Sequence, residues 1–456
     1  MKTTFLYYLV IVGLFLIGCR EDENSGINTP QDNLVDPEPV NGDENYLNKN
    51  SDYIFDQTKL HSFDLTISEE NLFRINSDPA AEEYVEGSLT FEGERIAPVG
   101  IRYKGSVGAF VNCLSGSNFL EPEGFKICTK LSMKIKINWN GSDQKFYGLK
   151  KLQFHSMNLD PTQMRDRMAY HLFAEMGIPS PRAVHARLNI NGEFVGLFIL
   201  IEQIDNRFAK YHFDDGDGNI YKEIWPIDDN GQVSSDAVFQ NGLKTNEDDP
   251  QDFNLIRAFG SEISSSTESN RKEIVEKWMN VDEIISYAVV DRTIRADDGP
   301  FHWYCGGGSC SNHNFYWYED PIKEKFHLIP WDFDNSFENI ITNTNPVTPI
   351  KDGWGEISND CNPFPFGGFF LSQKSAACDK LTAAWVAFDE LYDAKRNEFI
   401  NGPFSKTNTD ALLNIWSAQV ASATETASIS HDDAISVADW QSAMNELRDQ
   451  LDFARE

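Results

Sequence analysis

Five side chains between residues 295 and 338 carry the oxygen donors that metal-assisted chemistry uses. They are Asp297, Asp298, Asn314, Asp332 and Asp334. Paired carboxylates and an amide suit a hard cation such as Mg²⁺, which prefers oxygen ligands and completes its shell with water and phosphate. A further carboxylate could accept the proton of a hydroxyl nucleophile. On spacing alone, an Asp beside Gly or Pro is more often a turn former, so the pattern permits this chemistry without requiring it.

A hairpin and a helix are predicted to position these donors. The segments FYWY and KFHLIPW alternate as strands do, and Glu319-Asp320-Pro321 joins them. Asp332 and Asp334 then lie just past the second strand. Asn280 is expected to cap a helix, VDEIISYAVVDRTI, which ends shortly before Asp298. The ends of these elements would therefore present the carboxylates.

Basic side chains that could face phosphate lie earlier in the chain. The segment LSMKIKI alternates, so a strand there projects Lys134 and Lys136 from one side. Lys222 follows a turn at residues 214–219. A solvated strand face explains the two strand lysines equally well, because lysine is seldom buried without a partner.

A second helix and a second hairpin complete this part of the chain. DPTQMRDRMAYHLFAEMG predicts a helix with Asp160 as N-cap and Gln163 completing a capping box. Arg165 lies near its first turn, where basic charge opposes the helix dipole, so a carboxylate or phosphate partner would explain it. Asn191-Gly192 is a strong hairpin turn signal, and the strand after it ends in Glu202.

Seven cysteines are present, and six of them form three pairs that are close in the sequence. Proximity favours pairing Cys113 with Cys128, Cys305 with Cys310, and Cys361 with Cys378. A zinc site is disfavoured, because these cysteines are neither CxxC pairs nor interleaved with histidines at helical spacing. Disulfides persist in exported proteins, so the pattern indicates an extracytoplasmic location.

The seventh cysteine, Cys19, ends an N-terminal export signal. Lys2 is followed by an apolar run that is shorter than a membrane span, and the run ends in LIGC, which resembles a bacterial lipobox. The resemblance implies a signal peptide over residues 1–18 and lipid on Cys19; an ordinary secretory signal or a short uncleaved anchor is the alternative. Residues 19–51 are acidic and poor in apolar residues, which predicts a disordered tether. The acidic residues just after Cys19 resemble the surface-export signal of Bacteroidetes lipoproteins.

The charge of the chain restricts its partners. The 71 acidic and 39 basic residues give a net charge of −32. Such a field repels nucleic acid and anionic lipid, so nucleic acid is excluded as a partner and the membrane is reached only through the lipid. The roughly 400 residues after the tether can bury a large core, organised as one domain or as two lobes.

Several motifs in a fixed order resemble the CotH family of atypical, kinase-like proteins. They are TKLSMKIKI, then FYGLKKLQFHSMNLDPTQMRDRMAYHLFAEMG with the hairpin after it, then GNIYK, then SNHNFYWY, and finally IPWDFDNSF. The resemblance covers most of residues 60–340. It implies an α+β, two-lobed kinase-like fold with antiparallel sheets and a helical C-terminal part. It also implies ATP and Mg²⁺ as cofactors and transfer of the γ-phosphoryl group to Ser or Thr.

The same resemblance implies a role for each candidate residue. Asp298, or its neighbour Asp297, takes the place of the catalytic aspartate that orients the acceptor hydroxyl. Asp332 takes the metal-binding place, with Asn314 and Asp334 as further ligands. Lys134 or Lys136, paired to Glu202, would hold the α and β phosphates. Lys222 and Arg165 are secondary candidates for contact with phosphate.

Two features depart from the family pattern. Tyr103-Lys104 stands between Arg102 and Gly105, where the family has a compact glycine-containing segment. The segment CGGGSC between Asp298 and Asn314 is expected to be a disulfide-closed loop that could reshape or block the acceptor site.

The sequence therefore predicts a kinase-like domain over residues 52–340, completed by a helical extension over residues 341–456. The function that follows is a lipid-anchored kinase acting on a surface or secreted protein, at the outer membrane or cell surface. The alternative is a surface binding or adhesion lipoprotein that keeps the fold without catalysis.

Overall fold

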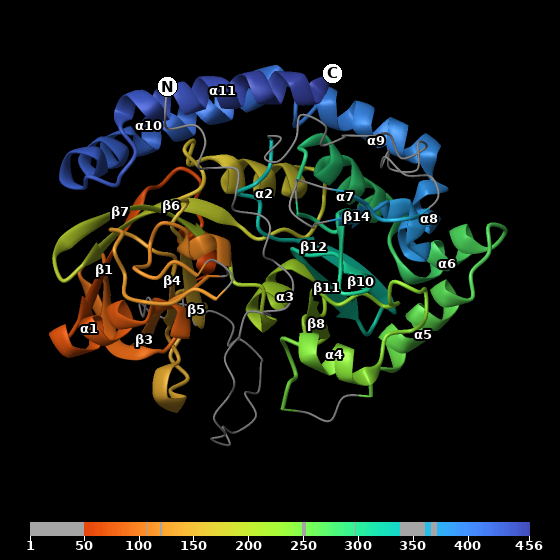
Figure 1. Cartoon of the computed structure of the whole chain (residues 1–456), viewed down its shortest axis with the longest axis horizontal. Helices are drawn as coiled ribbons and strands as arrows, with labels where there is room; N and C mark the ends of the chain where they lie inside the picture. The colour runs from red at the N-terminus through yellow and green to blue at the C-terminus, as the bar shows by residue number, and fades with distance from the viewer. Residues whose placement is uncertain are drawn as a thin grey trace.

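The computed structural model describes residues 50–105, 107–118, 121–248, 252–296, 298–337, 361–365 and 372–456. The predicted signal peptide, Cys19, nearly all of the tether and Asp297 lie outside these described residues. The described chain folds around two hydrophobic cores, one inside a β-barrel and one in a mixed helical and sheet region. Figure 1 shows the barrel on the left, the second region on the right, and two long C-terminal helices across the top of both. The predicted α+β class is confirmed.

Seven strands form the closed barrel, in the order β1-β2-β3-β4-β5-β7-β6. All neighbouring pairs are antiparallel except β1 with β6, which are parallel and close the barrel. Closure leaves no free sheet edge, so the inward side chains of every strand share one core. The strands are β1 (His61–Ile67), β2 (Val85–Phe91), β3 (Glu94–Tyr103), β4 (Met133–Lys136), β5 (Lys151–His155), β6 (Ala183–Ile190) and β7 (Glu193–Ile201).

Two predictions for segments that lie in the barrel, a hairpin turn and an alternating strand, are confirmed. The turn between β6 and β7 has positive φ at both Asn191 (53°) and Gly192 (85°), which is the conformation that Asn-Gly favours in a two-residue hairpin. On β4, Met133 and Ile135 point into the barrel core, whereas Lys134 lies on the other face and is nevertheless buried.

The second core packs around two small antiparallel sheets. One has the order β12-β11-β8 and contains the predicted FYWY hairpin; the other has the order β10-β9-β14-β13. Trp317 and Tyr318 of β11 are almost fully buried, so this sheet forms part of the core. The strands are β8 (Asn219–Lys222), β9 (Trp303–Gly306), β10 (Ser309–Ser311), β11 (Phe315–Asp320), β12 (Lys325–Pro330), β13 (Phe364–Pro365) and β14 (Ser372–Lys374).

Helix α7 (Val281–Thr293) confirms one prediction, and helix α2 (Arg165–Glu175) corrects another. The side chain of Asn280 caps α7 by accepting from the backbone N–H of Glu283. Helix α2, in contrast, begins five residues after the predicted cap at Asp160, so that prediction was wrong. Asp160 closes a separate turn by accepting from the backbone N–H groups of Thr162 and Arg165, and Gln163 has a φ of 62°, which no α-helix tolerates.

The remaining helices lie at the barrel, around the second core and over both. Helix α1 packs on β2, and α4, α5 and α6 surround the second core with α8 and α9. Helix α10 contacts β7 and α11, as Figure 1 shows along its top edge. Their bounds are α1 (Glu69–Ser77), α3 (Asn206–His212), α4 (Asp236–Gly242), α5 (Asn254–Ser264), α6 (Arg271–Trp278), α8 (Lys380–Val386), α9 (Asp389–Asn401), α10 (Lys406–Ser430) and α11 (Val437–Arg455).

The C-terminal helices are tied to residues far away in the chain. Gln419 of α10 accepts a hydrogen bond from Arg167 at 2.7 Å, and Thr424 of α10 donates to Gln163 at 2.9 Å. The indole of Trp440 in α11 donates to the carbonyl of Thr162 at 3.0 Å. These contacts hold α10 and α11 against the segment that enters α2.

All three predicted disulfides are present, joining Cys113 to Cys128, Cys305 to Cys310, and Cys361 to Cys378. The Cys305–Cys310 bridge closes the turn between β9 and β10, as CGGGSC predicted. Within the described parts of the chain, every helix is too short or too polar to span a bilayer.

Candidate functional site

Asp298 and Asn314 meet beyond the end of α7. The side-chain amide of Asn314 donates to a carboxylate oxygen of Asp298 at 3.1 Å. Both residues have positive φ, 77° and 56°, a conformation that Asp and Asn adopt more readily than most residues. The backbone N–H of Asn314 donates to Glu223 at 3.2 Å, and Glu223 directly follows β8. Three segments of the second core therefore converge at this point.

Asp332 lies just past β12, beside the first turn of α2. Its backbone N–H donates to the hydroxyl of Tyr170 at 3.0 Å, and its φ is 63°. Burial raises the pKa of the Asp332 carboxyl; the charges of Lys104 and Lys222 oppose that shift, and the charge of Glu223 adds to it. Glu223 thus acts on both Asp332 and Asn314, which connects the two predicted halves of the site.

Two more carboxyl groups, those of Asp166 and Asp334, are close enough to Asp332 for its charge to affect their pKa values. Burial, followed by the charge of Asp332, raises the pKa of Asp166 to about 8. Burial and the charges of Asp332 and Asp166 also raise the pKa of Asp334, and Arg165 opposes this. Arg165 donates to the backbone carbonyl of Asp334 at 3.3 Å, and the carboxylate partner predicted for Arg165 is Asp160, 3.8 Å from its guanidinium. Mutual repulsion among buried acids is typical of functional sites.

Lys104 brings positive charge to this cluster from the barrel. Its ammonium group lies 2.7 Å from Nε2 of His155 and 5.4 Å from the centre of the Trp331 ring. Burial and the charge of Lys104 lower the pKa of His155, so the neutral imidazole can accept a hydrogen bond from the lysine. Lys104 also opposes the raised pKa values of Asp166 and Asp332.

Sequence reasoning missed Lys104, Asp166, His155 and Glu223. The signal for Lys104 was available: IRYK alternates along β3 and its end, with Tyr103 in the barrel core, which places Lys104 on the opposite face. Treating Tyr103-Lys104 as an insert obscured this alternation.

The other predicted phosphate-binding residues occupy different surroundings. Lys134 is only 3% exposed and lies opposite Arg102 and Gln153 in the neighbouring strands. Lys136 is half-buried, with its ammonium 5.9 Å from the centre of the Tyr84 ring. The ammonium of Lys222 lies 6.0 Å from the centre of the Tyr316 ring and acts electrostatically on Asp332.

Glu202 belongs to a separate cluster at the end of β7. Arg182 contacts it at 2.6 Å and His212 at 3.1 Å. Burial favours the protonated form, but the hydrogen bond from His212 and the charge of Arg182 outweigh it and lower the pKa of Glu202 to about 2. The same guanidinium binds Asp52 at 2.8 Å, so Glu202 also fixes the beginning of the described chain.

The donors at the site suit Mg²⁺ in their chemistry. In the described ranges no three His, Cys, Asp or Glu side chains are placed to hold a metal by themselves. Mg²⁺ is, however, usually bound through one or two carboxylates together with waters and substrate phosphates. Asp332 and Asn314 would hold it here, and a cation would favour the charged carboxylates of Asp166, Asp332 and Asp334, whose pKa values are raised by burial and by neighbouring acids.

A barrel lobe that contributes Lys104 and a second lobe that contributes Asp298, Asn314 and Asp332 define a kinase-like protein. A family model described as CotH kinase protein matches residues 101–455, so the chain belongs to that family. Family membership indicates use of a nucleotide and a metal. The chain is also similar to the Inner spore coat protein H of Bacillus subtilis (strain 168), with 25% identity over 204 residues that cover 41% of this chain and 50% of that protein. It therefore spans about half the length of this curated relative.

Proposed function

We propose that the chain is a lipid-anchored, extracytoplasmic protein kinase that transfers the γ-phosphoryl group of ATP to Ser or Thr of a surface or secreted protein. One observation carries the proposal: Asn314 contacts both Asp298 and Glu223, and the charges of Glu223, Lys104 and Lys222 all act on the carboxyl group of Asp332. Phosphoryl transfer depends on positioned charge around phosphate more than on covalent help from the protein.

Each residue then has a defined task. Asp298 accepts the proton of the acceptor hydroxyl while the hydroxyl oxygen attacks the γ-phosphorus; the bond to the β–γ bridging oxygen breaks and ADP leaves. Asp332 and Asn314 would hold Mg²⁺, which neutralises charge on the phosphates. Lys104 and Lys222 supply further positive charge, and His155 keeps the ammonium of Lys104 in place.

The proposed location is supported by the predicted lipobox at Cys19 and by the disulfides. Three bridges in one chain are typical of an oxidising compartment. Attached lipid would keep the enzyme at the outer membrane or cell surface, and the acidic segment before Asn50 would determine how far the site reaches from the membrane. Labelling with palmitate in cells, lost in Cys19→Ser, tests the anchor.

A phosphate-transfer assay tests the activity. The full-length chain is incubated with Mg²⁺ and ATP labelled in the γ-phosphate, with a surface-protein extract as acceptor. Asp298→Asn and Asp332→Asn should each reduce incorporation at least roughly a hundredfold, because each removes a charge that acts during transfer. Asp214→Asn is the matched control, since Asp214 is exposed and pairs only with Lys323 among its described contacts.

Equal labelling by wild type and Asp332→Asn would contradict the assignment. Calorimetry with ATP and Mg²⁺ separates the remaining possibilities. Nucleotide binding without transfer would point to a missing acceptor, whereas no binding at millimolar ATP would favour the adhesion lipoprotein.

A further inference from the structure

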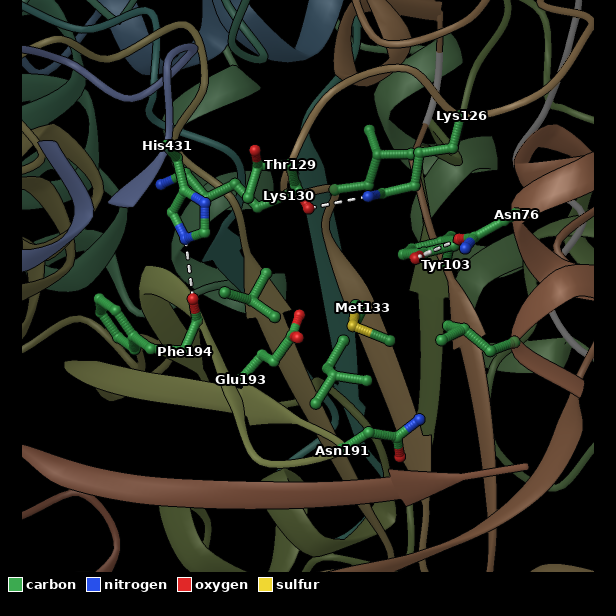
Figure 2. A pocket seen from close by; sticks show the side chains of 14 residues that line it. Asn76, Tyr103, Lys126, Thr129, Lys130, Met133, Asn191, Glu193, Phe194 and His431 are labelled. Atoms are coloured by element: carbon green, nitrogen blue, oxygen red, sulfur yellow. Dashed lines mark hydrogen bonds between the residues drawn. The ribbon is translucent and has the colours of Figure 1, made fainter. Parts of the chain in front are cut away.

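A pocket of about 370 Å³ opens at one mouth of the barrel, outside the kinase-like site. Figure 2 shows Lys126, Thr129 and Lys130 along one side of it and Asn191 and Glu193 along the other, with Met133 between them. Helix α1, the β6–β7 hairpin and the segment after α10 supply the remaining walls. This volume lies near the lower end of the range for small-molecule sites, roughly 300 to 1,000 Å³.

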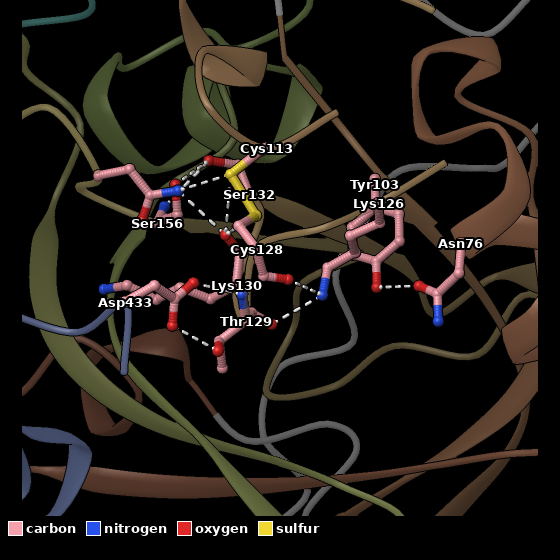
Figure 3. The surroundings of a disulfide bond; sticks show 11 residues. Asn76, Tyr103, Cys113, Lys126, Cys128, Thr129, Lys130, Ser132, Ser156 and Asp433 are labelled. Atoms are coloured by element: carbon pink, nitrogen blue, oxygen red, sulfur yellow. Dashed lines mark hydrogen bonds between the residues drawn. A yellow bond between two sulfur atoms is a disulfide. The ribbon is translucent and has the colours of Figure 1, made fainter. Parts of the chain in front are cut away.

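The two lysines are held by backbone carbonyls. Lys126 donates to the carbonyls of Cys128 and Thr129 at 2.7 and 2.8 Å, and Lys130 donates to the carbonyl of Leu197 at 2.8 Å. Figure 3 shows the Cys113–Cys128 disulfide beside this segment; Lys126 lies inside the loop that the bridge closes, and Lys130 follows it by two residues. Their ammonium groups are therefore fixed in position before any ligand arrives.

Neither ammonium forms an ion pair with a carboxylate in the part of the chain that the structure describes. Asp433, the nearest acid along this wall, uses its carboxylate on the backbone N–H and hydroxyl of Thr129. Burial lowers the pKa of both lysines to about 8, and Asp433 opposes this shift. In a chain of net charge −32, two half-buried cations without a paired carboxylate are uncommon, because burial costs a charged group part of its hydration.

The rest of the lining is mixed: seven residues are apolar or aromatic, and the five polar ones are Asn76, Thr129, Asn191, Glu193 and His431. Met133 forms the floor with Leu131, while Ile190 and Val195 come from the hairpin side. Tyr103 donates to the side chain of Asn76 at 2.8 Å, which satisfies its hydroxyl and leaves its ring in the pocket. The pocket thus combines fixed positive charge on one wall with an apolar floor.

We propose that this barrel-mouth pocket binds a small organic anion, with its carboxylate against the wall of Lys126 and Lys130 and its apolar body over Met133 and Val195. Its occupant is an amphiphile of the size of a medium-chain fatty acid. The site is separate from the one that binds nucleotide in the proposed function, so either can be correct without the other.

Calorimetric titration of the full-length chain with sodium octanoate tests the proposal, with 1-octanol and acetate as ligands that lack one of the two features. Octanoate should bind, and both controls should bind at least tenfold more weakly, because each loses either the charge or the apolar body. Lys126→Met and Lys130→Met should each weaken octanoate binding at least tenfold. Lys272→Met, an exposed lysine on α6, should leave it unchanged.

Two further measurements keep the test decisive if a lysine variant fails to fold. Val195→Trp should abolish octanoate binding by filling the pocket while both lysines remain. For wild type, octanoate affinity should fall between pH 7 and 9 as Lys126 and Lys130 lose their protons. The other titratable groups facing these lysines are Asp433, Asp160, Glu193, His431 and Tyr103.

The proposal is overturned if octanoate fails to bind wild type at millimolar concentration, or if 1-octanol binds equally well. It is also overturned if octanoate affinity is unchanged in folded Lys126→Met and Lys130→Met. In that case Lys126 and Lys130 serve only to hold the backbone around Cys128 and at Leu197.

Discussion

Replacing Glu202 by Gln separates a structural role from a catalytic one. The Glu202 side chain is 1% exposed and contacts Arg182 and His212, which together hold its pKa near 2. Gln keeps the shape and one acceptor oxygen but removes the charge. It leaves the Arg182 guanidinium, itself 15% exposed, without its buried counter-charge.

The expected loss of unfolding free energy follows from the lowered pKa of Glu202. A drop from the ordinary 4.5 to about 2 corresponds to about 3 kcal/mol of stability at neutral pH, at about 1.4 kcal/mol per pH unit. Breaking a buried ion pair by removing one partner costs a similar amount, roughly 3 to 5 kcal/mol. Because the pKa is lowered on folding, this stability is present above pH 4.5 and is lost as the pH falls through about 2.

Urea unfolding of wild type and Glu202→Gln at pH 7, 5 and 3, followed by tryptophan fluorescence, measures the difference. We expect a loss of about 3 kcal/mol at pH 7 that shrinks towards pH 3. Asp236→Asn is the control, since Asp236 also contacts an arginine at 2.6 Å but is 59% exposed, and its effect should be much smaller. A loss that is the same at pH 7 and pH 3 would refute the reasoning. If Glu202 orients a phosphate-binding lysine, as the sequence suggested, KM for ATP should rise while the unfolding free energy stays unchanged.

Three further predictions follow from the structure. Lys104→Met should raise KM for ATP at least roughly tenfold in initial-rate assays, because the cation facing Asp166 and Asp332 is lost. Converting Cys113 and Cys128 to Ser should lower the unfolding free energy by about 3 kcal/mol in urea, since the bridge closes a loop with a sequence separation of 15. Trp440→Ala should cost roughly 3 to 5 kcal/mol in the same measurement, because Trp440 is 6% exposed and its indole donates to Thr162; a change below about 1 kcal/mol would show that α11 does not stabilise the fold.

Local patterns were enough to predict several elements of this fold. The hairpin at Asn191-Gly192, the cap at Asn280 and the three disulfides each depend on residues within about 20 positions of one another. Turn geometry, capping and short loop closure act over such distances, so composition and spacing carry the information. The start of α2 was mispredicted because Asp is favoured both as a helix N-cap and in turns. In either conformation its carboxylate accepts hydrogen bonds from backbone N–H groups that follow it, as Asp160 does here.

The sequence by itself determined which side chains are available for the site. They are paired carboxylates near residues 298 and 332, an amide at Asn314, and lysines at alternating positions of a strand. Only the tertiary structure decided which lysine acts on the acids and that His212 joins Arg182 at Glu202. The charge of Lys104 acts on Asp332 across more than 200 residues of chain, whereas Glu202 lies opposite Arg182 at the open end of the β6–β7 hairpin. The first of these depends on how the two cores pack, which the spacing of neighbouring residues does not encode, whereas the second follows from the hairpin register set by the Asn191-Gly192 turn.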